Sequence, residues 1–164
     1  MALPSGYRLR LGSPLDRSLL VKFMQRTYAE LQEEGRLNHL AQTVEQYLST
    51  ETPIWWVETD CSSIALLSRS LSGHYSVPIA CLWLGTAIDQ LHGDSHAYIF
   101  LLYVAPEHRR RGIGTTLMQQ AEAWAKQRGD RQIGLQVFQT NDAALRLYQA
   151  LGYQPQSLWL VKPL

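Results

Sequence analysis

The sequence predicts a mixed α/β domain in which strands and helices form separate layers. In the second half of the chain, apolar strand-like runs alternate with amphipathic helical runs, which is typical of layered α/β folds. The chain has 164 residues, the length of one ordinary domain, so we expect a single domain over residues 1–164. An apolar share of 46% is sufficient to form a core in a domain of this size.

The first half of the chain predicts two strands and two helices. Strands are indicated by alternating or branched and aromatic residues, and helices by apolar residues at intervals of three and four. The predicted elements are a strand over Tyr7–Leu11, a helix from Pro14 to near Gly35, a helix over Leu37–Leu48, a strand over Pro53–Thr59 and an excursion over Asp60–Ser76.

The second half of the chain predicts regular strand-helix alternation. Pro106 ends an apolar strand, Gly129 and Gly152 follow predicted helices, and Gly85 suggests a bulge within a strand. The predicted strands cover Val77–Ile88, Ala97–Val104, Gln132–Phe138 and Ser157–Val161, and the predicted helices cover Gly112–Arg128 and Asn141–Leu151.

Composition and charge argue against several classes of protein. A net charge of +1 gives no support to a nucleic-acid partner. Cys61 and Cys81 have no metal-ligand spacing and form no disulfide scaffold, so we expect no metal site. No apolar run approaches the ~20 residues of a membrane span, and the first residues lack the signal-peptide pattern. We therefore expect a cytoplasmic protein without a membrane partner.

The most informative stretch joins the strand that ends at Val104 to the helix that begins at Gly112. The first N–H groups of a helix have no partner within it and lie at the positive end of its dipole, where they form an anion site. Gly112 and Gly114 lack a Cβ, so a phosphate oxygen can approach the backbone closely. The three residues Arg109–Arg111 add positive charge beside them. This pattern predicts a pyrophosphate ligand.

The spacing of this stretch separates three kinds of pyrophosphate loop. An ATP-type loop requires Gly-Lys-Ser/Thr, which is absent, and a dinucleotide loop requires a third glycine where Leu117 stands. What remains is Arg109-x-x-Gly112-x-Gly114, preceded by Val104-x-Pro106. This spacing resembles the signature of the GNAT (GCN5-related N-acetyltransferase) superfamily.

A second stretch resembles the same superfamily. The family pattern Asn-x-x-Ala-x-x-Leu/Phe-Tyr-x-x-x-Gly-Phe/Tyr is matched by Asn141, Ala144, Leu147, Tyr148, Gly152 and Tyr153. The tail from Trp159 also looks like the closing strand of the family. The resemblance extends from about Ile79 to the C-terminus.

The resemblance implies a central, mostly antiparallel sheet with helices on both faces and two diverging parallel strands. It implies acetyl-coenzyme A (coenzyme A) as co-substrate, with its pyrophosphate on the amides around Arg111–Gly114. It also implies that the pantetheine arm pairs with the backbone of the preceding strand, as an added strand would. The implied coenzyme-binding residues are Leu102, Tyr103, Val104, Arg109, Arg110, Arg111, Gly112, Ile113, Gly114, Thr115, Asn141, Ala144 and Tyr148.

Two of these residues keep a second interpretation. Tyr148 matches a family tyrosine that protonates the leaving thiolate, and a phenol with a reference pKa of ~10 is protonated at neutral pH. It also fits as a core aromatic residue of its helix. Asn141 fits as a contact of the pantetheine arm and as a helix cap.

The residue that removes the proton of the attacking amine is less defined. Many relatives carry a glutamate where this chain has Tyr98, so the usual base is missing. Strand alternation predicts His96, Tyr98, Phe100 and Leu102 on one side, so His96 is a candidate that acts through water. Glu58 is a second candidate by analogy of fold, and a water path to solvent without a dedicated base is a third.

The acceptor remains open between several alternatives. The expected activity is direct transfer of an acetyl group from acetyl-coenzyme A to a primary amine on a small molecule or peptide. The rivals are an acetyltransferase for protein N-termini or lysines, and a catalytically silent coenzyme A-binding sensor. Glu30, Glu33 and Glu34 could attract a cationic amine, and at least one of Trp55 and Trp56 should face the core. The sequence does not fix the oligomeric state; a homodimer is the assembly considered.

Overall fold

A five-stranded sheet forms the centre of the molecule in the computed structural model, which describes residues 2–30, 38–60 and 77–163. The strands lie in the order β1-β2-β3-β4-β5, and the neighbours from β1 to β4 pair antiparallel, whereas β4 and β5 pair parallel. The expected mostly antiparallel sheet is therefore confirmed. The strands cover Tyr7–Leu11 (β1), Ile54–Thr59 (β2), Pro78–Ile88 (β3), Ser95–Val104 (β4) and Ile133–Leu135 (β5).

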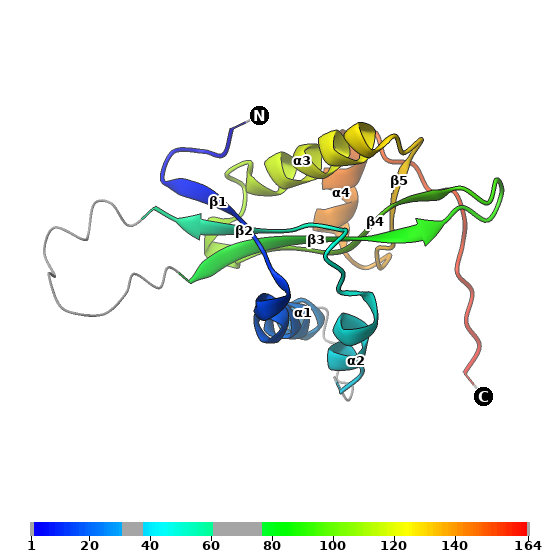
Figure 1. The fold of residues 1–164 in the computed structure, drawn as a ribbon, viewed down its shortest axis with the longest axis horizontal. Helices are drawn as coiled ribbons and strands as arrows, with labels where there is room; N and C mark the ends of the chain where they lie inside the picture. Colours follow the sequence, from blue (N-terminus) through cyan, green and yellow to red (C-terminus); the bar gives the residue numbers. More distant parts are fainter. Residues whose placement is uncertain (1, 31–37, 61–76, 164) are drawn as a thin grey trace, which may run out of the picture.

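Helices cover both faces of this sheet (Figure 1). On one face, α1 (Arg17–Glu30) and α2 (Asn38–Tyr47) lie side by side; on the other, α3 (Ile113–Arg128) and α4 (Asp142–Ala150) pack. We call these the α1 face and the α3 face. The helix predicted from Pro14 begins with a short 3-10 turn capped by Ser13, and its predicted end near Gly35 lies outside the described residues, as do Leu37 and the excursion over 61–76.

Two adjacent tryptophans of β2 show how the two cores are separated. Trp56 is fully buried on the α1 face, where its ring meets Phe23 of α1 edge-on at 5.0 Å. Trp55 packs into the α3-face cluster together with Leu117 of α3. Because side chains alternate along a strand, both residues are core residues, and neither is free to line an acceptor site.

A bulge in β4 changes which side chains point to which face. Trp83 of β3 pairs with Leu101 and Leu84 pairs with Ile99, so Phe100 is an extra residue in β4. The bulge places Leu101 on the α1 face and Ile99 on the α3 face, although the two residues are separated by only one position. The alternation of β4 is therefore reversed beyond Phe100.

This reversal corrects one prediction made from alternation. Tyr98 and Phe100 do share the α1 face, with ring centroids 5.1 Å apart. Leu102, expected on the same side, packs instead with the α3-face cluster. The prediction failed because strict alternation holds only along a strand that lacks an extra residue.

Gly85 has a different role from the one expected. The bulge lies across from it in β4, and Gly85 itself pairs with Tyr98 in regular register. A Cβ at Gly85 would collide with the ring of Phe100. The glycine therefore provides the space that the bulged aromatic residue occupies.

The parallel pairing of β4 with β5 is short. It runs only from Ala97↔Ile133 to Ile99↔Leu135, whereas β4 continues to Val104. The strand predicted over Gln132–Phe138 is therefore shortened to three residues, because the chain leaves β4 and loses its hydrogen-bonding partner. This is the divergence of two parallel strands that the family resemblance implied.

The strand predicted over Ser157–Val161 is wrong in this structure. The segment after α4 has no strand and runs away from the sheet (Figure 1). The side chains from Leu158 to Val161 are 72–85% exposed. Branched and aromatic residues favour extended structure, but a strand also requires a partner edge, and β5 has only three paired residues.

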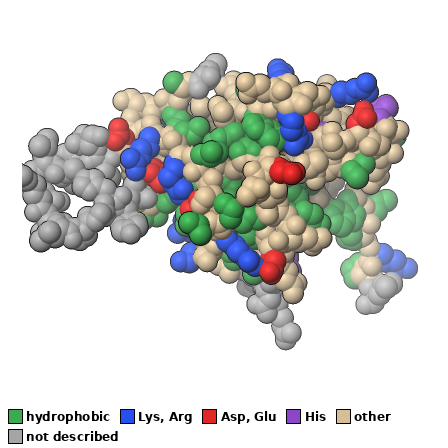
Figure 2. All heavy atoms as spheres, viewed as in Figure 1, with side chains coloured by type: hydrophobic (Ala, Val, Ile, Leu, Met, Phe, Trp, Pro, Cys, Tyr) green, Lys and Arg blue, Asp and Glu red, His purple; other side chains and the backbone are tan. Residues whose placement is uncertain are grey.

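The opposite edge of the sheet belongs to β1. Leu9 and Leu11 of this strand are 42% and 65% exposed. In the view of Figure 2, hydrophobic side chains gather in the middle of the surface and charged side chains lie around them.

Candidate active site

The turn between β4 and α3 presents backbone N–H groups outward. The chain passes through a 3-10 turn over Pro106–His108 and reaches Gly112, whose φ of 82° is the left-handed conformation that glycine adopts without strain. Gly112 has no side chain to cap the helix. The first N–H bonded within α3 belongs to Thr116, which donates to the Gly112 carbonyl at 2.9 Å.

The N–H groups of residues 113–115 therefore have no acceptor within the described part of the chain. They lie at the positive end of a 16-residue helix. Gly114 stands in the middle of this group and packs beside α4. A Cβ at Gly114 would lie 3.4 Å from Cδ2 of Leu147 and 4.0 Å from Cγ2 of Val104, which are ordinary contacts. The absence of a side chain at Gly114 is therefore not required by protein packing.

Arg109 is directed away from these amides. Its Nε donates to the carbonyl of Val104 at 2.7 Å, and its NH2 group pairs with Oε2 of Glu30 at 2.6 Å. Its guanidinium also lies over the ring of Tyr103, 5.9 Å from the centroid. Arg109 joins the turn to the end of α1, which suits a positioning role better than direct phosphate contact.

The other two arginines differ from each other. Arg111 donates to the hydroxyl of Tyr7 at 2.9 Å and to the carbonyl of Glu107 at 3.1 Å, which fixes the turn to β1. Arg110 is exposed, has a φ of 63°, and makes no hydrogen bond or ion pair within the described ranges. Of the three predicted phosphate contacts, Arg110 is the one whose guanidinium is available.

Beyond Ile99, the edge of β4 that faces away from β3 has no strand partner in the described chain. Leu102 and Val104 direct their side chains to the α3 face, and Tyr103 packs against Phe23 on the α1 face. Unpaired backbone groups of a strand can pair with an extended ligand that carries amides.

Tyr148 and Asn141 of the second motif lie in α4 and at its N-terminal cap. Tyr148 packs against the α3-face cluster, and burial raises the pKa of its phenol to about 12. The ring of Tyr153 is 5.8 Å away. Asn141 caps α4, since its side-chain oxygen accepts from the N–H of Ala144 at 3.1 Å. Capping is therefore observed for Asn141, and its amide nitrogen remains available to a ligand.

His96 is buried on β4 with one nitrogen unsatisfied. Its side chain is 8% exposed, and Nδ1 has no hydrogen-bond partner in the described residues. A Cβ at Gly134 of β5 would lie 3.0 Å from His96 Nε2 and 3.6 Å from a ring carbon of Tyr98. His96 also lines a cavity of about 400 Å³ that Ser95, Gly129 and Gln132 help to form.

Two other candidates for the base differ in position. Tyr98 lies on the same face as His96, and burial raises the pKa of its phenol, so it holds its proton at neutral pH. Glu58 is buried on β2 and accepts from Nε of Arg8 at 2.9 Å and from Nε of Arg10 at 2.8 Å. Both carboxylate oxygens of Glu58 are thus engaged by guanidinium groups, two strands away from β4.

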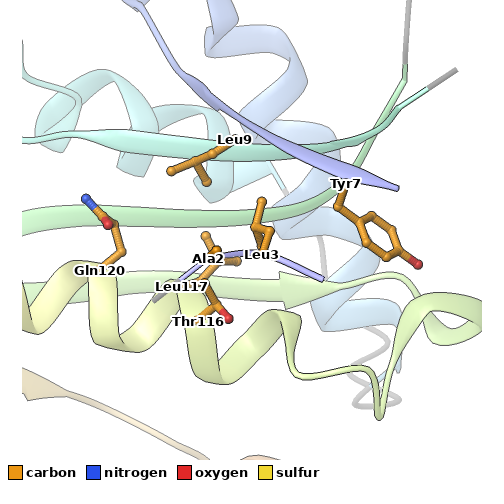
Figure 3. Close-up of a pocket in the computed structure, with 7 residues that line it drawn as sticks. All are labelled: Ala2, Leu3, Tyr7, Leu9, Thr116, Leu117 and Gln120. Atoms are coloured by element: carbon orange, nitrogen blue, oxygen red, sulfur yellow. The ribbon is translucent and has the colours of Figure 1, made fainter. Parts of the chain in front are cut away.

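A second cavity, of about 340 Å³, lies on the β1 side of α3 (Figure 3). Its lining is uncharged and includes Leu3, Tyr7, Thr116 and Gln120. The cavity has no cationic side chain suited to a phosphate. Within the described part of the chain, no three His, Cys, Asp or Glu side chains are placed to hold a metal ion, and no helix is both long and apolar enough to cross a membrane.

Comparison with known proteins identifies the class to which this fold and turn belong. The sequence profile described as the Acetyltransferase (GNAT) family matches residues 24–153, which is most of the chain. The chain belongs to this family, and the resemblance seen in its two motifs is confirmed. A structure of a predicted acetyltransferase with acetyl-CoA from Clostridium acetobutylicum has the same fold, with a TM-score of 0.72, 19% identity and coverage of 96% of both chains.

Two curated relatives of this chain are named as N-acetyltransferases. An aminoglycoside N(6')-acetyltransferase type 1 from Acinetobacter genomosp. 13 is 29% identical over 76% of this chain and 72% of its own length. An uncharacterized N-acetyltransferase of Bacillus subtilis is 38% identical over 39% of this chain. The match spans only 26% of that Bacillus protein.

Sequence reasoning missed several residues around the divergence of β4 and β5. The bulge at Phe100 left no signal, because an extra residue in a strand preserves its composition. Gly134 was a visible signal, since a glycine inside a predicted strand often marks a close approach. Asp130, which accepts from the N–H of Ala97 at 2.9 Å and so holds the start of β4, had no sequence signature.

Proposed function

We propose that this protein transfers an acetyl group from acetyl-coenzyme A to a primary amine. The observation that carries the proposal is the position of three unbonded N–H groups, in residues 113–115, beside an unpaired edge of β4. The N–H groups suit a diphosphate, and the edge of β4 suits an extended arm with amide bonds. The N–H groups and the strand edge adjoin through Val104 and the turn, as a single continuous ligand requires.

The chain's own residues fit this ligand. The N–H groups of Ile113, Gly114 and Thr115 would hold the diphosphate, with the free guanidinium of Arg110 beside them. Backbone groups between Phe100 and Val104 would pair with the pantetheine amides. Asn141 would add its amide nitrogen while its oxygen continues to cap α4.

The bound co-substrate supplies an activated acyl group in the form of a thioester. In the reaction, the amine nitrogen forms a bond to the acyl carbon, the carbon–sulfur bond breaks, sulfur keeps the electron pair, and the amine loses one proton. Tyr148 would donate a hydrogen bond to the departing sulfur. Its phenol has a pKa of about 12, above the ~8.5 of a thiol, so it stabilises the thiolate without full proton transfer.

We assign acceptance of the amine proton to His96, acting through water. The imidazole lies on the same face as Tyr98, and its Nδ1 has no competing partner in the described residues. The cavity of about 400 Å³ that His96 lines provides a route from the imidazole to solvent. Glu58 has no part in this proposal, because two arginines already engage it.

Gly114→Ala tests the coenzyme site with little disturbance of the fold. The new Cβ meets only ordinary contacts in the protein but occupies the space through which a phosphate would approach. We expect the KM for acetyl-coenzyme A to rise about tenfold, because the variant loses roughly one charge-assisted hydrogen bond to the diphosphate. Thiol release and calorimetric binding of coenzyme A measure the change, and the melting temperature should stay constant.

Gly112→Ala and Gly129→Ala form a matched pair for the same site. Both glycines have left-handed φ angles, 82° and 93°, with nothing within 4 Å of a new Cβ. Backbone strain is thus equal, but only Gly112 adjoins the proposed anion site. The proposal is overturned if Gly112→Ala, Gly114→Ala and Gly129→Ala all bind coenzyme A with the same affinity. Binding without thiol release for any amine would instead favour a silent coenzyme-binding module.

A small-molecule acceptor is the form of the proposal that the relatives support, since three of them are named aminoglycoside N(6')-acetyltransferase type 1. Transfer to protein N-termini or lysines is the alternative, and the same thiol-release assay with peptides tests it. Cytoplasmic location and a homodimer stay predictions.

A further inference from the structure

The turn between β4 and α3 has few backbone hydrogen bonds of its own. The N–H groups of His108 and Arg109 donate to the carbonyls three residues earlier, at 2.9 and 3.2 Å. In the described part of the chain, no further N–H of the turn bonds to the backbone before that of Thr116. Side-chain contacts must therefore hold residues 110–115, the stretch that presents the N–H groups proposed to bind the diphosphate.

Two residues of this stretch have left-handed backbone conformations. The φ angles are 63° for Arg110 and 82° for Gly112. Glycine adopts this conformation without strain, but a residue with a Cβ adopts it at a cost in free energy. The side chain of Arg110 makes no hydrogen bond or ion pair within the described ranges, so it does not hold its own backbone. A contact from elsewhere has to oppose the tendency of this residue to leave the left-handed region.

The hydroxyl of Tyr7 in β1 provides such a contact. It accepts a hydrogen bond from Nη1 of Arg111 at 2.9 Å and lies 2.8 Å from Nδ1 of His108. Because a guanidinium only donates, the phenolic hydrogen is left for Nδ1 of His108, which accepts it in its Nε2–H form. One oxygen atom therefore joins the residue two positions before Arg110 to the residue directly after it.

The position of Tyr7 is fixed by the sheet rather than by the turn. Its backbone pairs with Thr59 in the antiparallel ladder of β1 and β2, and its ring packs with the α3-face cluster. Figure 3 shows the ring directed from β1 toward the chain that leads into α3. The other connection of the turn, between Arg109 and Glu30, joins side chains that are 42% and 38% exposed, and solvent weakens such a pair.

We infer that Tyr7 is a positioning residue for coenzyme binding. Its hydroxyl keeps Arg110 left-handed and so keeps the N–H groups of residues 113–115 in the arrangement that a diphosphate requires. This inference rests on the proposed binding of coenzyme A and adds to it a residue 104 positions away from Arg111 in the chain. A turn that is competent for only part of the time lowers the apparent affinity by that fraction. The bound coenzyme restores the competent form, so the chemical step is unaffected.

Tyr7→Phe tests this role, because it keeps the ring and its packing and removes only the bridging oxygen. We expect the Kd for coenzyme A and the KM for acetyl-coenzyme A to rise about fivefold, as the competent fraction of the turn falls. The kcat at saturating acetyl-coenzyme A and the KM for the amine should not change. Calorimetric binding and steady-state thiol release measure these four quantities, and the melting temperature should fall only slightly.

The same substitution in an Arg110→Asn background separates positioning from general damage to the fold. Asparagine adopts the left-handed conformation more readily than arginine, so the bridging oxygen has less strain to oppose. In this background Tyr7→Phe should raise the Kd for coenzyme A less than about twofold. The loss of the Arg110 guanidinium affects both members of this pair equally and cancels from the ratio. General damage to the fold would give the same ratio in both backgrounds.

Thr43→Val is the matched control, because it removes a hydroxyl that donates to the His39 carbonyl at 3.0 Å on α2. It should leave the Kd for coenzyme A unchanged. The role of Tyr7 is overturned if Tyr7→Phe keeps the wild-type Kd, if it lowers kcat together with affinity, or if its effect is equal in both backgrounds. Weaker coenzyme binding in Gly114→Ala alone would remove this role and keep the proposed function, whereas a wild-type protein without coenzyme binding would overturn both.

Discussion

The two faces of the sheet contribute to the proposed active site in different ways. On the α3 face, the proposed coenzyme site consists mainly of backbone groups between Phe100 and Thr115, in one continuous stretch of chain. On the α1 face, aromatic side chains from α1, α2, β4 and the segment after β5 come together beside the point where β4 and β5 diverge. The proposed coenzyme site is contiguous in sequence, whereas these aromatic side chains are brought together only by folding.

This difference explains why one ligand is evident in the sequence and the other is not. A backbone site requires particular φ angles and absent side chains, which restrict residues such as Gly112 and Gly114 at fixed spacing. A side-chain site can be formed from many residue combinations at many positions. A backbone site is therefore evident from a short motif, whereas a site made of side chains leaves no comparable motif.

Tyr148→Phe gives the largest effect we expect and tests whether the α3 face supplies chemistry as well as binding. The variant should lower kcat about a hundredfold, or ~2.7 kcal/mol, because the departing thiolate loses one hydrogen bond to its negative charge. In the described residues the Tyr148 hydroxyl has no hydrogen-bond partner to lose, and the ring keeps its packing against the α3-face cluster. The KM for acetyl-coenzyme A and the melting temperature should therefore change little in steady-state and thermal assays.

Tyr153→Phe is the control for this variant, since its ring lies 5.8 Å from Tyr148 and burial likewise raises its pKa. It should retain most of the activity. A kcat within threefold of the wild type for Tyr148→Phe would leave the α3 face a binding surface only. Because the folded state holds the Tyr148 proton more tightly, its contribution to stability is complete below pH ~10 and is lost toward about pH 12. Wild-type stability should accordingly fall more steeply above pH 10 than that of Tyr148→Phe.

Glu58→Gln tests whether the edge of the α1 face holds a base or a structural ion pair. The amide cannot attract both guanidinium groups as the buried carboxylate does, and Arg8 and Arg10 are 55% and 37% exposed, which moderates the loss. We expect a loss of about 2 kcal/mol in the free energy of unfolding, or roughly 4–8 °C in melting temperature. The pH dependence of kcat should remain unchanged.

Glu45→Gln serves as the comparison, because its pair with Arg17 is exposed at both ends. It should alter the free energy of unfolding by under about 0.5 kcal/mol. The opposite result for Glu58→Gln, a large loss of kcat at constant melting temperature, would identify a catalytic carboxylate on the α1 face and weaken the assignment to His96.

The same contrast between backbone and side chains governs how much of the structure could be predicted. The predicted strands and helices around the two motifs are observed within a few residues, because Pro106, Gly112 and Gly129 restrict the backbone locally. The bulge at Phe100 could not be predicted, because it depends on the pairing of β4 with β3, which lies across the sheet.

The wrong strand over Ser157–Val161 and the ion pair of Arg109 have a similar origin. Residues Ser157–Val161 have the composition of a strand, but their state depends on whether an edge is available for pairing. Arg109 has the position of a phosphate contact, but Glu30, 79 residues earlier in the chain, engages its guanidinium. In both cases the local structure depends on a partner that is distant in the chain, and the local sequence does not indicate that partner.

Glu30→Gln gives the smallest effect and tests whether the two faces act independently. Arg109 and Glu30 are 42% and 38% exposed, so their pair should contribute less than about 1 kcal/mol to folding. Arg109 keeps its bond to the Val104 carbonyl and its position over Tyr103 in this variant, so the turn should stay in place. We therefore expect the KM for acetyl-coenzyme A to change less than threefold. The opposite outcome is a larger rise in this KM at constant melting temperature, with an equal rise in Arg109→Gln. It would show that α1 positions the turn between β4 and α3. The two faces would then not act independently.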